Sequence, residues 1–443
     1  MNNLSFGNLD NCRSVLKDVS VDDIRIDFPA MGPGSDAHNP HTTYSNPYVV
    51  LRDSDGCCGH GIGFTLGMGN EHVCQAIKEL FPILENQTIG DLFGDFRTFW
   101  RRLANPPQRR WLGPYCGIYY MAAGALANAF FDLVAKKQGV PLWDLLCSLS
   151  PAQTTRLIDF RFVEHLMDEK EALKILIDNS PEKELRKDKL RIKGLPCYYT
   201  TWIGSCSEDL GMQVEREIFL KGINHFKIKV GRHLEEDLAK LRWLRNHFGD
   251  RIELYADANQ VWSPPQAIVW IRHLSQFGIR WIEEPTAPDS VDGHRFIKEQ
   301  VEPLGVEVVT GENCPNSHVA AHFISSGSVN RFQIDACRVL GPAENLLIML
   351  LAKQFKIPVC PHAGGSGLDE LVPHLSAWNE ISLGAGSSAA MTEHVAICSK
   401  YFMSPSRVLN GKLQLPSQPG YLVGMTSEAL QNYKYPNGRH WRP

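Results

Sequence analysis

Hydrophobic and polar residues alternate in two different ways along the chain. Between about residues 16 and 72, strand-like stretches such as VSVDDIRI and NPYVVLRDSDG are interrupted by glycine and proline. Residues 72–84 and 118–146 then carry apolar residues at three- and four-residue spacing, which is typical of helices. Strands followed by helices predict an α+β domain in the first part of the chain.

The second part of the chain repeats a strand-helix unit. Short apolar strands, most of them followed by a helical stretch, begin near residues 226, 251, 280, 306, 329 and 357. This repetition implies parallel strands, and five or more units in a row favour a closed (β/α) barrel over an open sheet. A charge-rich segment at 177–193 separates the two parts, and we interpret it as a solvated surface segment at the domain junction.

Polar residues stand at the end of each predicted barrel strand. In barrels of this kind the carboxyl ends of the strands carry the active site, so charges there are informative. Successive strand ends are separated by 23 to 29 residues, about one strand plus one helix. Folding alone would keep so many charges apart, which indicates a function for them. These residues are Lys227 with Lys229, Asp257, Glu283 with Glu284, Glu312, Asp335 and His362.

Three adjacent strands would bring carboxylates together. They come from Asp257, from one of Glu283 and Glu284, and from Glu312; side-chain parity alone leaves the choice within the EEP motif open. Such carboxylates repel one another unless a cation lies between them. Donors that are all oxygen favour Mg²⁺ over zinc or copper. The sequence therefore predicts a magnesium site.

Groups for proton transfer flank this predicted site. The strand HFKIKV (225–230) projects Lys227 and Lys229 to one face, a pattern that, taken alone, is also found on exposed edge strands. Like charge and partial burial both lower the pKa of a lysine, so we expect one of the two to act as a base near neutrality. On the far side, Asp335 and His362 come from neighbouring strands and form a candidate acid/base pair.

Composition narrows the partners without identifying them. The chain is 43% hydrophobic and 21% charged with a formal net charge of -4, so it gives no indication of nucleic acid or an anionic membrane as partner. Its twelve cysteines lack the spacing of a zinc site or a disulfide ladder. The start of the sequence lacks a signal-peptide pattern, and we find no stretch near the roughly 20 apolar residues of a membrane span. We expect a cytoplasmic protein.

The strand-end motifs resemble those of the enolase superfamily. FKIKVG, YADANQVWSPPQAI, WIEEPTAPDSVDGH, TGEN, QIDACR and IPVCPHAGG are similar to motifs of the mandelate-racemase-like acid-sugar dehydratases. GSDA (34–37), LIDFRF (157–162) and QPGYLVGM (418–425) resemble the L-fuconate and L-galactonate dehydratase group more narrowly. One departure is WLGPYCG (111–117), which has Tyr-Cys where the family has a Glu-Lys pair.

The resemblance implies a role for each residue at the strand ends. Within the EEP motif it selects Glu283, which joins Asp257 and Glu312 as the three ligands of Mg²⁺. Lys229 resembles the catalytic base, and Lys227 resembles its electrostatic partner.

Further residues resemble the acid/base and substrate contacts of the family. His362 with Asp335 resembles the second acid/base, and Glu393 in MTEHV resembles the residue that hydrogen-bonds the substrate carboxylate or the enolate. The loops 34–38 and 60–68 are implied to close over the site. Substrate contacts are expected from Asn259, Ser35, Asp36 and Thr65.

The same resemblance implies a fold and an activity. The fold is of the α/β class: a TIM-type (β/α)7β barrel at 191–410, an α+β capping domain at 1–190, and a C-terminal tail at 411–443 that returns to the cap. The activity is Mg-dependent removal of water from a sugar acid, an aldonate such as L-fuconate or L-galactonate, to give a 2-keto-3-deoxy acid. A homo-oligomer is expected.

Two other functions stay open at the level of sequence. A racemase, epimerase or cycloisomerase on this scaffold would use the same ligands and bases. A family member without catalysis, kept for binding, is the second alternative; five intact strand-end residues weigh against it, since buried charges are costly to keep without a use. They are Lys229, Asp257, Glu283, Glu312 and His362.

Overall fold

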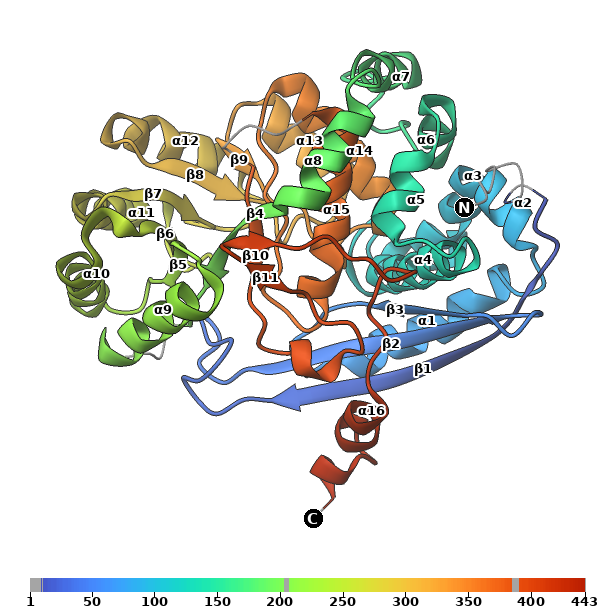
Figure 1. Ribbon diagram of the computed structural model, residues 1–443, viewed down its shortest axis with the longest axis horizontal. Coiled ribbons are helices and arrows are strands. Elements are labelled where there is room, and N and C mark those ends of the chain that lie inside the picture. The colour runs from blue at the N-terminus through green and yellow to red at the C-terminus, as the bar shows by residue number, and fades with distance from the viewer. Residues whose placement is uncertain (1–8, 10, 203–206, 385–389, 443) are drawn as a thin grey trace.

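The protein consists of an α+β cap and a strand-helix barrel (Figure 1). The computed structural model describes residues 9, 11–202, 207–384 and 390–442. The predicted α/β class, with a capping domain and a (β/α)7β barrel, is confirmed.

The cap is built on an antiparallel sheet in the order β1-β2-β3: β1 (Leu16–Asp27), β2 (Thr43–Asp53) and β3 (Cys58–Ile62). Two helices, α1 (Asn70–Leu80) and α4 (Gly117–Lys137), pack against it. Strand β3 approaches α4 so closely that a Cβ at Gly61 would lie 2.3 Å from the carbonyl oxygen of Ala125. Close approach of two backbones therefore requires glycine at this position.

Helix α4 forms the core of the cap. By length and composition it could cross a membrane, which the sequence analysis did not anticipate, but 83% of its apolar window is buried inside the protein. It contacts β3, α1 and the barrel helix α14 (Gly341–Phe355). The helix carries apolar residues on most of its sides because other elements pack around it.

Shorter helices complete the N-terminal part and lead into the barrel. The charge-rich segment 177–193 forms the end of α7 and all of α8, and α8 packs on α15 (Leu368–Leu383). Along α8, Leu190 is the buried position among exposed and half-buried charged residues. The shorter helices of the N-terminal part are α2 (Ile89–Gly94), α3 (Phe96–Ala104), α5 (Leu142–Ser148), α6 (Pro151–Leu157), α7 (Glu169–Asp178) and α8 (Lys183–Lys193).

The barrel strands are parallel and follow chain order from β4 to β9. The ring closes through the extended segment 358–361, where Pro358 accepts from Phe332 N–H at 3.0 Å and Pro361 from Glu393 N–H at 3.4 Å. Strand β10 then pairs with β4. The strands are β4 (Leu195–Thr200), β5 (His225–Lys229), β6 (Glu253–Asp257), β7 (Ile279–Glu283), β8 (Glu307–Thr310), β9 (Arg331–Phe332) and β10 (Thr392–His394).

A helix follows each of these strands until the ring closes. Besides α14 and α15, these helices are α9 (Ser207–Lys221), α10 (Leu234–Phe248), α11 (Pro264–Leu274), α12 (Val291–Val301) and α13 (Ser317–Ser325). The small strands β11 (Val408–Leu409) and β12 (Lys412–Leu413) extend the sheet beside β4. The tail returns to the cap, where α16 (Ser427–Tyr433) lies beside β1 and Tyr435 N–H donates to Asp23 O at 2.8 Å (Figure 1).

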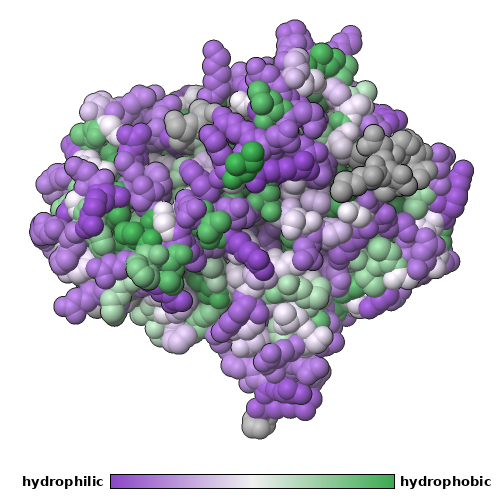
Figure 2. All heavy atoms as spheres, in the orientation of Figure 1, coloured by the Kyte–Doolittle hydropathy of each residue, from purple (hydrophilic) through white to green (hydrophobic). Residues whose placement is uncertain are grey.

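The face shown in Figure 2 is largely hydrophilic, with hydrophobic side chains gathered over α9. This helix exposes Met212, Phe219 and Leu220, with 87% of Phe219 accessible. Assembly into a homo-oligomer stays a prediction.

Candidate active site

The candidate site lies at the carboxyl ends of the barrel strands, where the register brings the charged residues into one row. Lys229, the last residue of β5, pairs with Asp257, the last residue of β6. Asp257 pairs in turn with Glu283, the last residue of β7. Residues that are one strand-helix unit apart in the sequence are therefore direct neighbours across the sheet.

Three carboxylates form a compact group in this row. One oxygen from each of Asp257, Glu283 and Glu312 can be chosen so that all lie within 4.8 Å of one another. Asp257 and Glu283 are fully buried, and Glu283 Oε2 accepts no hydrogen bond from the described residues. Burial, followed by the charge of Asp257, raises the pKa of Glu283 well above its ordinary value. Crowded hard oxygen donors of this kind fit a divalent cation such as Mg²⁺.

The second glutamate of the EEP motif has hydrogen-bond partners outside this group. Glu284 has a positive φ of 43°, and its carboxylate accepts hydrogen bonds from Gln260 and Asn313, each at 2.9 Å. Parity had left Glu283 and Glu284 as alternatives, and the geometry places Glu283 with Asp257 and Glu312.

Both lysines of HFKIKV point into the carboxylates. Lys229 Nζ lies 2.5 Å from Asp257 Oδ2, and Lys227 Nζ lies 2.5 Å from Glu283 Oε1 and 2.8 Å from Glu393 Oε1. Burial alone would lower the pKa of each lysine, but these carboxylates outweigh it and hold both pKa values above the ordinary range. The expected lowering was wrong for this arrangement, because the charge of Asp257 affects Lys229 more strongly than the charge of Lys227 does.

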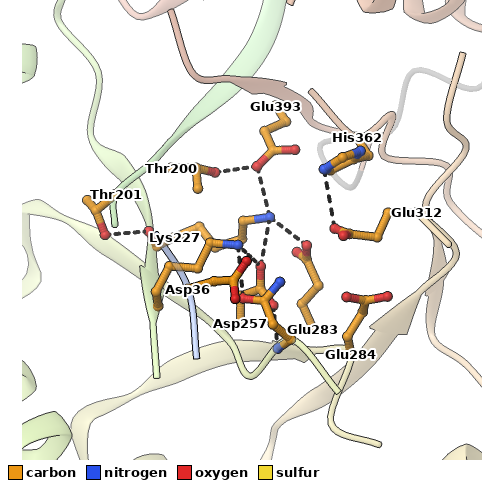
Figure 3. A network of polar contacts seen from close by, with 12 residues as sticks. Asp36, Thr200, Thr201, Lys227, Asp257, Glu283, Glu284, Glu312, His362 and Glu393 are labelled. Carbon is orange, nitrogen blue, oxygen red and sulfur yellow. Dashed lines mark hydrogen bonds and ion pairs between the residues drawn. The ribbon is translucent and has the colours of Figure 1, made fainter. Parts of the chain in front are cut away.

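Glu393 is a buried carboxylate that forms hydrogen bonds and an ion pair with its neighbours. It accepts hydrogen bonds from Thr200 Oγ1 and, at 2.6 Å, from Ala363 N–H, in addition to its contact with Lys227 (Figure 3). Burial alone would raise the pKa of Glu393, but Lys227 and His362 overcome this and hold it far below its ordinary value. Glu393 is therefore ionised here and acts as a hydrogen-bond acceptor.

His362 lies on the other side of the carboxylates. Its Nδ1 is 2.8 Å from Asp335 Oδ2, and its Nε2 is 3.3 Å from Glu312 Oε2 (Figure 3). Burial opposes a positive charge on the ring, but Glu312, Asp335 and Glu393 raise the pKa of His362 to about 9. The imidazole is therefore protonated at neutral pH, as a general acid requires.

The expected substrate contacts come from the barrel and from the cap. Asn259 accepts a hydrogen bond from Lys229 Nζ at 3.1 Å, and Asp36 from the cap lies beside Lys227 in Figure 3. Ser35 is buried beside it, and its hydroxyl has no partner among the described residues. Thr65 stays a predicted substrate contact, and its hydroxyl is hydrogen-bonded within the cap to Ser45 and, at 2.7 Å, to Asn70 Oδ1.

Some site residues were not identified from the sequence. Thr200 ends the first barrel strand and contacts Glu393, but its neutral side chain gave no charge pattern to follow. The signal that could have identified Thr200 is its position at the end of β4. Both cap loops reach the barrel as implied: Phe64 O accepts from Arg338 Nη1 at 3.3 Å, and Ala37 lies against Gly231.

Known protein families match both parts of the chain. The family described as Enolase C-terminal domain-like matches residues 209–429, and the Mandelate racemase / muconate lactonizing enzyme N-terminal domain matches residues 34–147.

Individual relatives match over nearly the full length. Mitochondrial enolase superfamily member 1 of Homo sapiens is 37% identical over 434 residues, 97% of this chain and 98% of that protein. Its crystal structure superimposes with a TM-score of 0.94, covering 97% and 98% of the two chains. L-galactonate dehydratase of Hypocrea jecorina is 37% identical over 419 residues, 94% of this chain and 92% of that protein. A racemase from Streptomyces coelicolor A3(2), crystallised with bound magnesium, shares the fold at 23% identity and a TM-score of 0.72, covering 93% and 97%.

Proposed function

The chain belongs to the enolase superfamily, and on this premise we propose that it is a hydro-lyase that removes water from a sugar acid. The product is a 2-keto-3-deoxy acid, and the substrate class is an aldonate of the L-galactonate or L-fuconate type. The similarity to L-galactonate dehydratase over 94% of the chain supports the choice of class.

One observation carries the proposal: the lysine and the histidine contact different members of one carboxylate group. Lys229 is paired with Asp257, whereas His362 faces Glu312. A substrate bound over the carboxylates would therefore meet a base from one strand and an acid from another. Dehydration of a 2,3-dihydroxy acid needs both, one at the C2 proton and one at the C3 hydroxyl.

The carboxylates define where the substrate acid binds. Asp257, Glu283 and Glu312 would hold a divalent cation such as Mg²⁺, which would supply Lewis-acid polarisation of the substrate carboxylate. Lys229, after its ammonium group has released a proton to solvent, takes the C2 proton of the substrate.

The remaining residues complete the reaction. Lys227, held between Glu283 and Glu393, faces the negative charge that develops on the substrate carboxylate as the C2 proton leaves. His362, oriented by Asp335, donates its proton to the C3 hydroxyl, which departs as water. The enol that results tautomerises to the 2-keto acid. We propose that Asp36 and Asn259 contact the substrate hydroxyls, which is supported by the hydrogen bond between Asn259 and Lys229 and by the place of Asp36 beside Lys227 in Figure 3.

The test compares two variants with matched surface substitutions. Lys229→Ala and His362→Asn should each abolish formation of 2-keto acid from L-galactonate or L-fuconate. Lys174→Ala, whose side chain is 78% exposed, and His72→Asn, which is 67% exposed, should keep full activity. Full turnover by either site variant would overturn the role assigned to that residue.

A racemase or epimerase is a second candidate, because Lys229 and His362 come from different strands and could exchange a proton at one carbon. Solvent deuterium separates the two functions. A dehydratase forms 2-keto acid, and its His362→Asn variant still exchanges the C2 proton. A racemase instead returns the substrate with inverted C2 and forms no keto acid.

A further inference from the structure

A cavity outside the candidate active site lies where the cap meets the barrel. The space between its walls is about 550 Å³ when the open mouth is included. The cap contributes α3 and residues 157–162, and the barrel contributes the starts of α13 and α14. Two stretches singled out in the sequence, WLGPYCG and LIDFRF, both supply wall residues that the proposed reaction does not use.

Aromatic rings form the outer wall. Tyr115 and Phe162 meet edge to face with centroids 4.8 Å apart, and Phe162 lies 5.3 Å from the ring of His318. Phe162 is 43% exposed, so this wall is open to solvent. Burial lowers the pKa of His318, which keeps its ring neutral at pH 7. Flat apolar faces at an open mouth suit a planar ring.

Trp100 contributes a further ring to the wall. It is 2% exposed, and its indole N–H has no acceptor among the described residues. An unsatisfied buried donor costs about 1–3 kcal/mol, so a wall with such a donor is better suited to a ligand that brings an acceptor.

Two guanidinium groups on the wall share one carboxylate. Arg101 Nη2 lies 2.7 Å from Asp159 Oδ1, and Arg161 Nη2 lies 2.6 Å from Asp159 Oδ2. Arg101 uses Nε and Nη2 for Asp159, so its Nη1 has no hydrogen-bond partner among the described residues. All three side chains are 29–40% exposed, so they can be reached from the mouth. One positive charge is left over in this group.

The other charged groups at the cavity have partners of their own. Arg97 pairs with Glu169 at 3.1 Å. Glu344 accepts from Tyr120 Oη and from the backbone N–H groups of Leu340 and Ser317, at 2.6–2.7 Å. These N–H groups belong to the starts of α13 and α14, whose dipoles favour a carboxylate there. Among the described residues, Asp159 is thus the carboxylate that forms ion pairs with Arg101 and Arg161.

We propose that this cavity is a second small-molecule site, which binds a carboxylate carrying a planar apolar ring. The ring lies against Tyr115 and Phe162, and the carboxylate accepts hydrogen bonds from Arg101 and Arg161. Because the walls come from both the cap and the barrel, a bound ligand stabilises their contact.

Benzoate is the probe that tests this site, by titration calorimetry on the full chain with EDTA present. EDTA removes divalent cations, so the carboxylate group at the candidate active site is not a cation-assisted anion site during the titration. We expect saturable 1:1 binding of benzoate. Benzamide, which has the same shape without the charge, should bind at least about tenfold more weakly, since a charge-assisted hydrogen bond is about twice as strong as a neutral one.

Variants locate the binding. Arg161→Gln removes the surplus charge and Phe162→Ala removes a ring, and each should weaken benzoate about tenfold or more. Arg272→Gln, an exposed arginine on α11, is the matched control and should bind like the wild type. Both wall residues are 40% or more exposed, so folding should survive, which circular dichroism checks. Absence of saturable binding, equal binding of benzamide, or undiminished binding by Arg161→Gln would each overturn the proposal.

Discussion

Lys229 Nζ lies 2.5 Å from Oδ2 of Asp257, so the candidate base is ion-paired with a candidate metal ligand. The two residues end adjacent strands in direct register. The pairing keeps the lysine protonated and couples its deprotonation to whatever else Asp257 binds. Base strength and metal binding are thereby linked in one contact.

This link predicts how the protein responds to magnesium. Chelation with EDTA should abolish turnover, and added Mg²⁺ should restore it. Mg²⁺ should also stabilise the fold by about 2.7 kcal/mol at a hundred times its Kd, because it relieves repulsion among Asp257, Glu283 and Glu312. Thermal unfolding with and without Mg²⁺ measures this, and Glu312→Gln should lose most of the shift. An equal shift in that variant would place the ion elsewhere.

Asp335 is predicted to act by positioning His362. Its Oδ1 accepts from the backbone N–H groups of Cys337 and Arg338, while Oδ2 faces His362 Nδ1. Asp335→Asn can keep the first two contacts but places an N–H donor or a neutral oxygen against the ring. We expect kcat for dehydration to fall about 10²-fold or more, with C2 proton exchange retained. Asp292→Asn, 84% exposed, is the control. Loss of exchange as well would show general disruption of the site.

Replacement by alanine should destabilise the protein more at Gly61 in β3 than at Gly139 in the loop after α4. At Gly61 an added Cβ would meet Ala125 O at 2.3 Å and Ala129 N at 2.4 Å. Gly61→Ala should therefore cost about 3 kcal/mol or more, because backbone must move. Gly139 has a φ of +68° and open space around it, so Gly139→Ala should cost about 1–2 kcal/mol. Urea unfolding of both variants tests the order, and a reversed order would contradict the packing of β3 on α4.

Stability toward acid should depend on a histidine remote from the carboxylates. His374 is fully buried and accepts the N–H of Trp143 on Nδ1, and burial lowers its pKa to about 3. The unfolded chain, with a pKa near 6.5, binds this proton first, so the stability contribution is complete above pH ~6.5 and falls as pH drops toward 3.

His374→Asn removes the titrating group and leaves an oxygen that can accept the same N–H. The variant should lose less of its unfolding free energy between pH 7 and pH 5 than the wild type does, by about 1–2 kcal/mol. Thermal unfolding at the two pH values gives the comparison. Parallel slopes for the two proteins would show that His374 is not the group that titrates.

Several features of the fold followed from local sequence. The regular strand-helix repeat predicted the barrel, and the spacing of polar residues predicted which side chains meet at its carboxyl end. Both predictions depend on the periodicity of the sequence. Because the strands are parallel and in register, the last residues of successive strands become spatial neighbours, as Lys229, Asp257 and Glu283 show.

Other features were decided only by the tertiary structure. The pKa of Lys229 depends on the distance from Asp257, and the ionisation of Glu393 depends on Lys227, which comes from another strand. The hydrogen-bond partners of Thr65 are Ser45 and Asn70, which lie 20 residues before it and 5 residues after it in the sequence. Electrostatic energies vary steeply with separation and burial, and neither can be read from the order of residues.

The sequence by itself thus determined the architecture and the set of chemical groups at the barrel mouth, since both are encoded in spacing along the chain. The tertiary structure alone decided which group holds a proton and where Arg101 and Arg161 converge on Asp159. Those outcomes rest on contacts a few ångströms long between distant segments, and only the folded chain creates them.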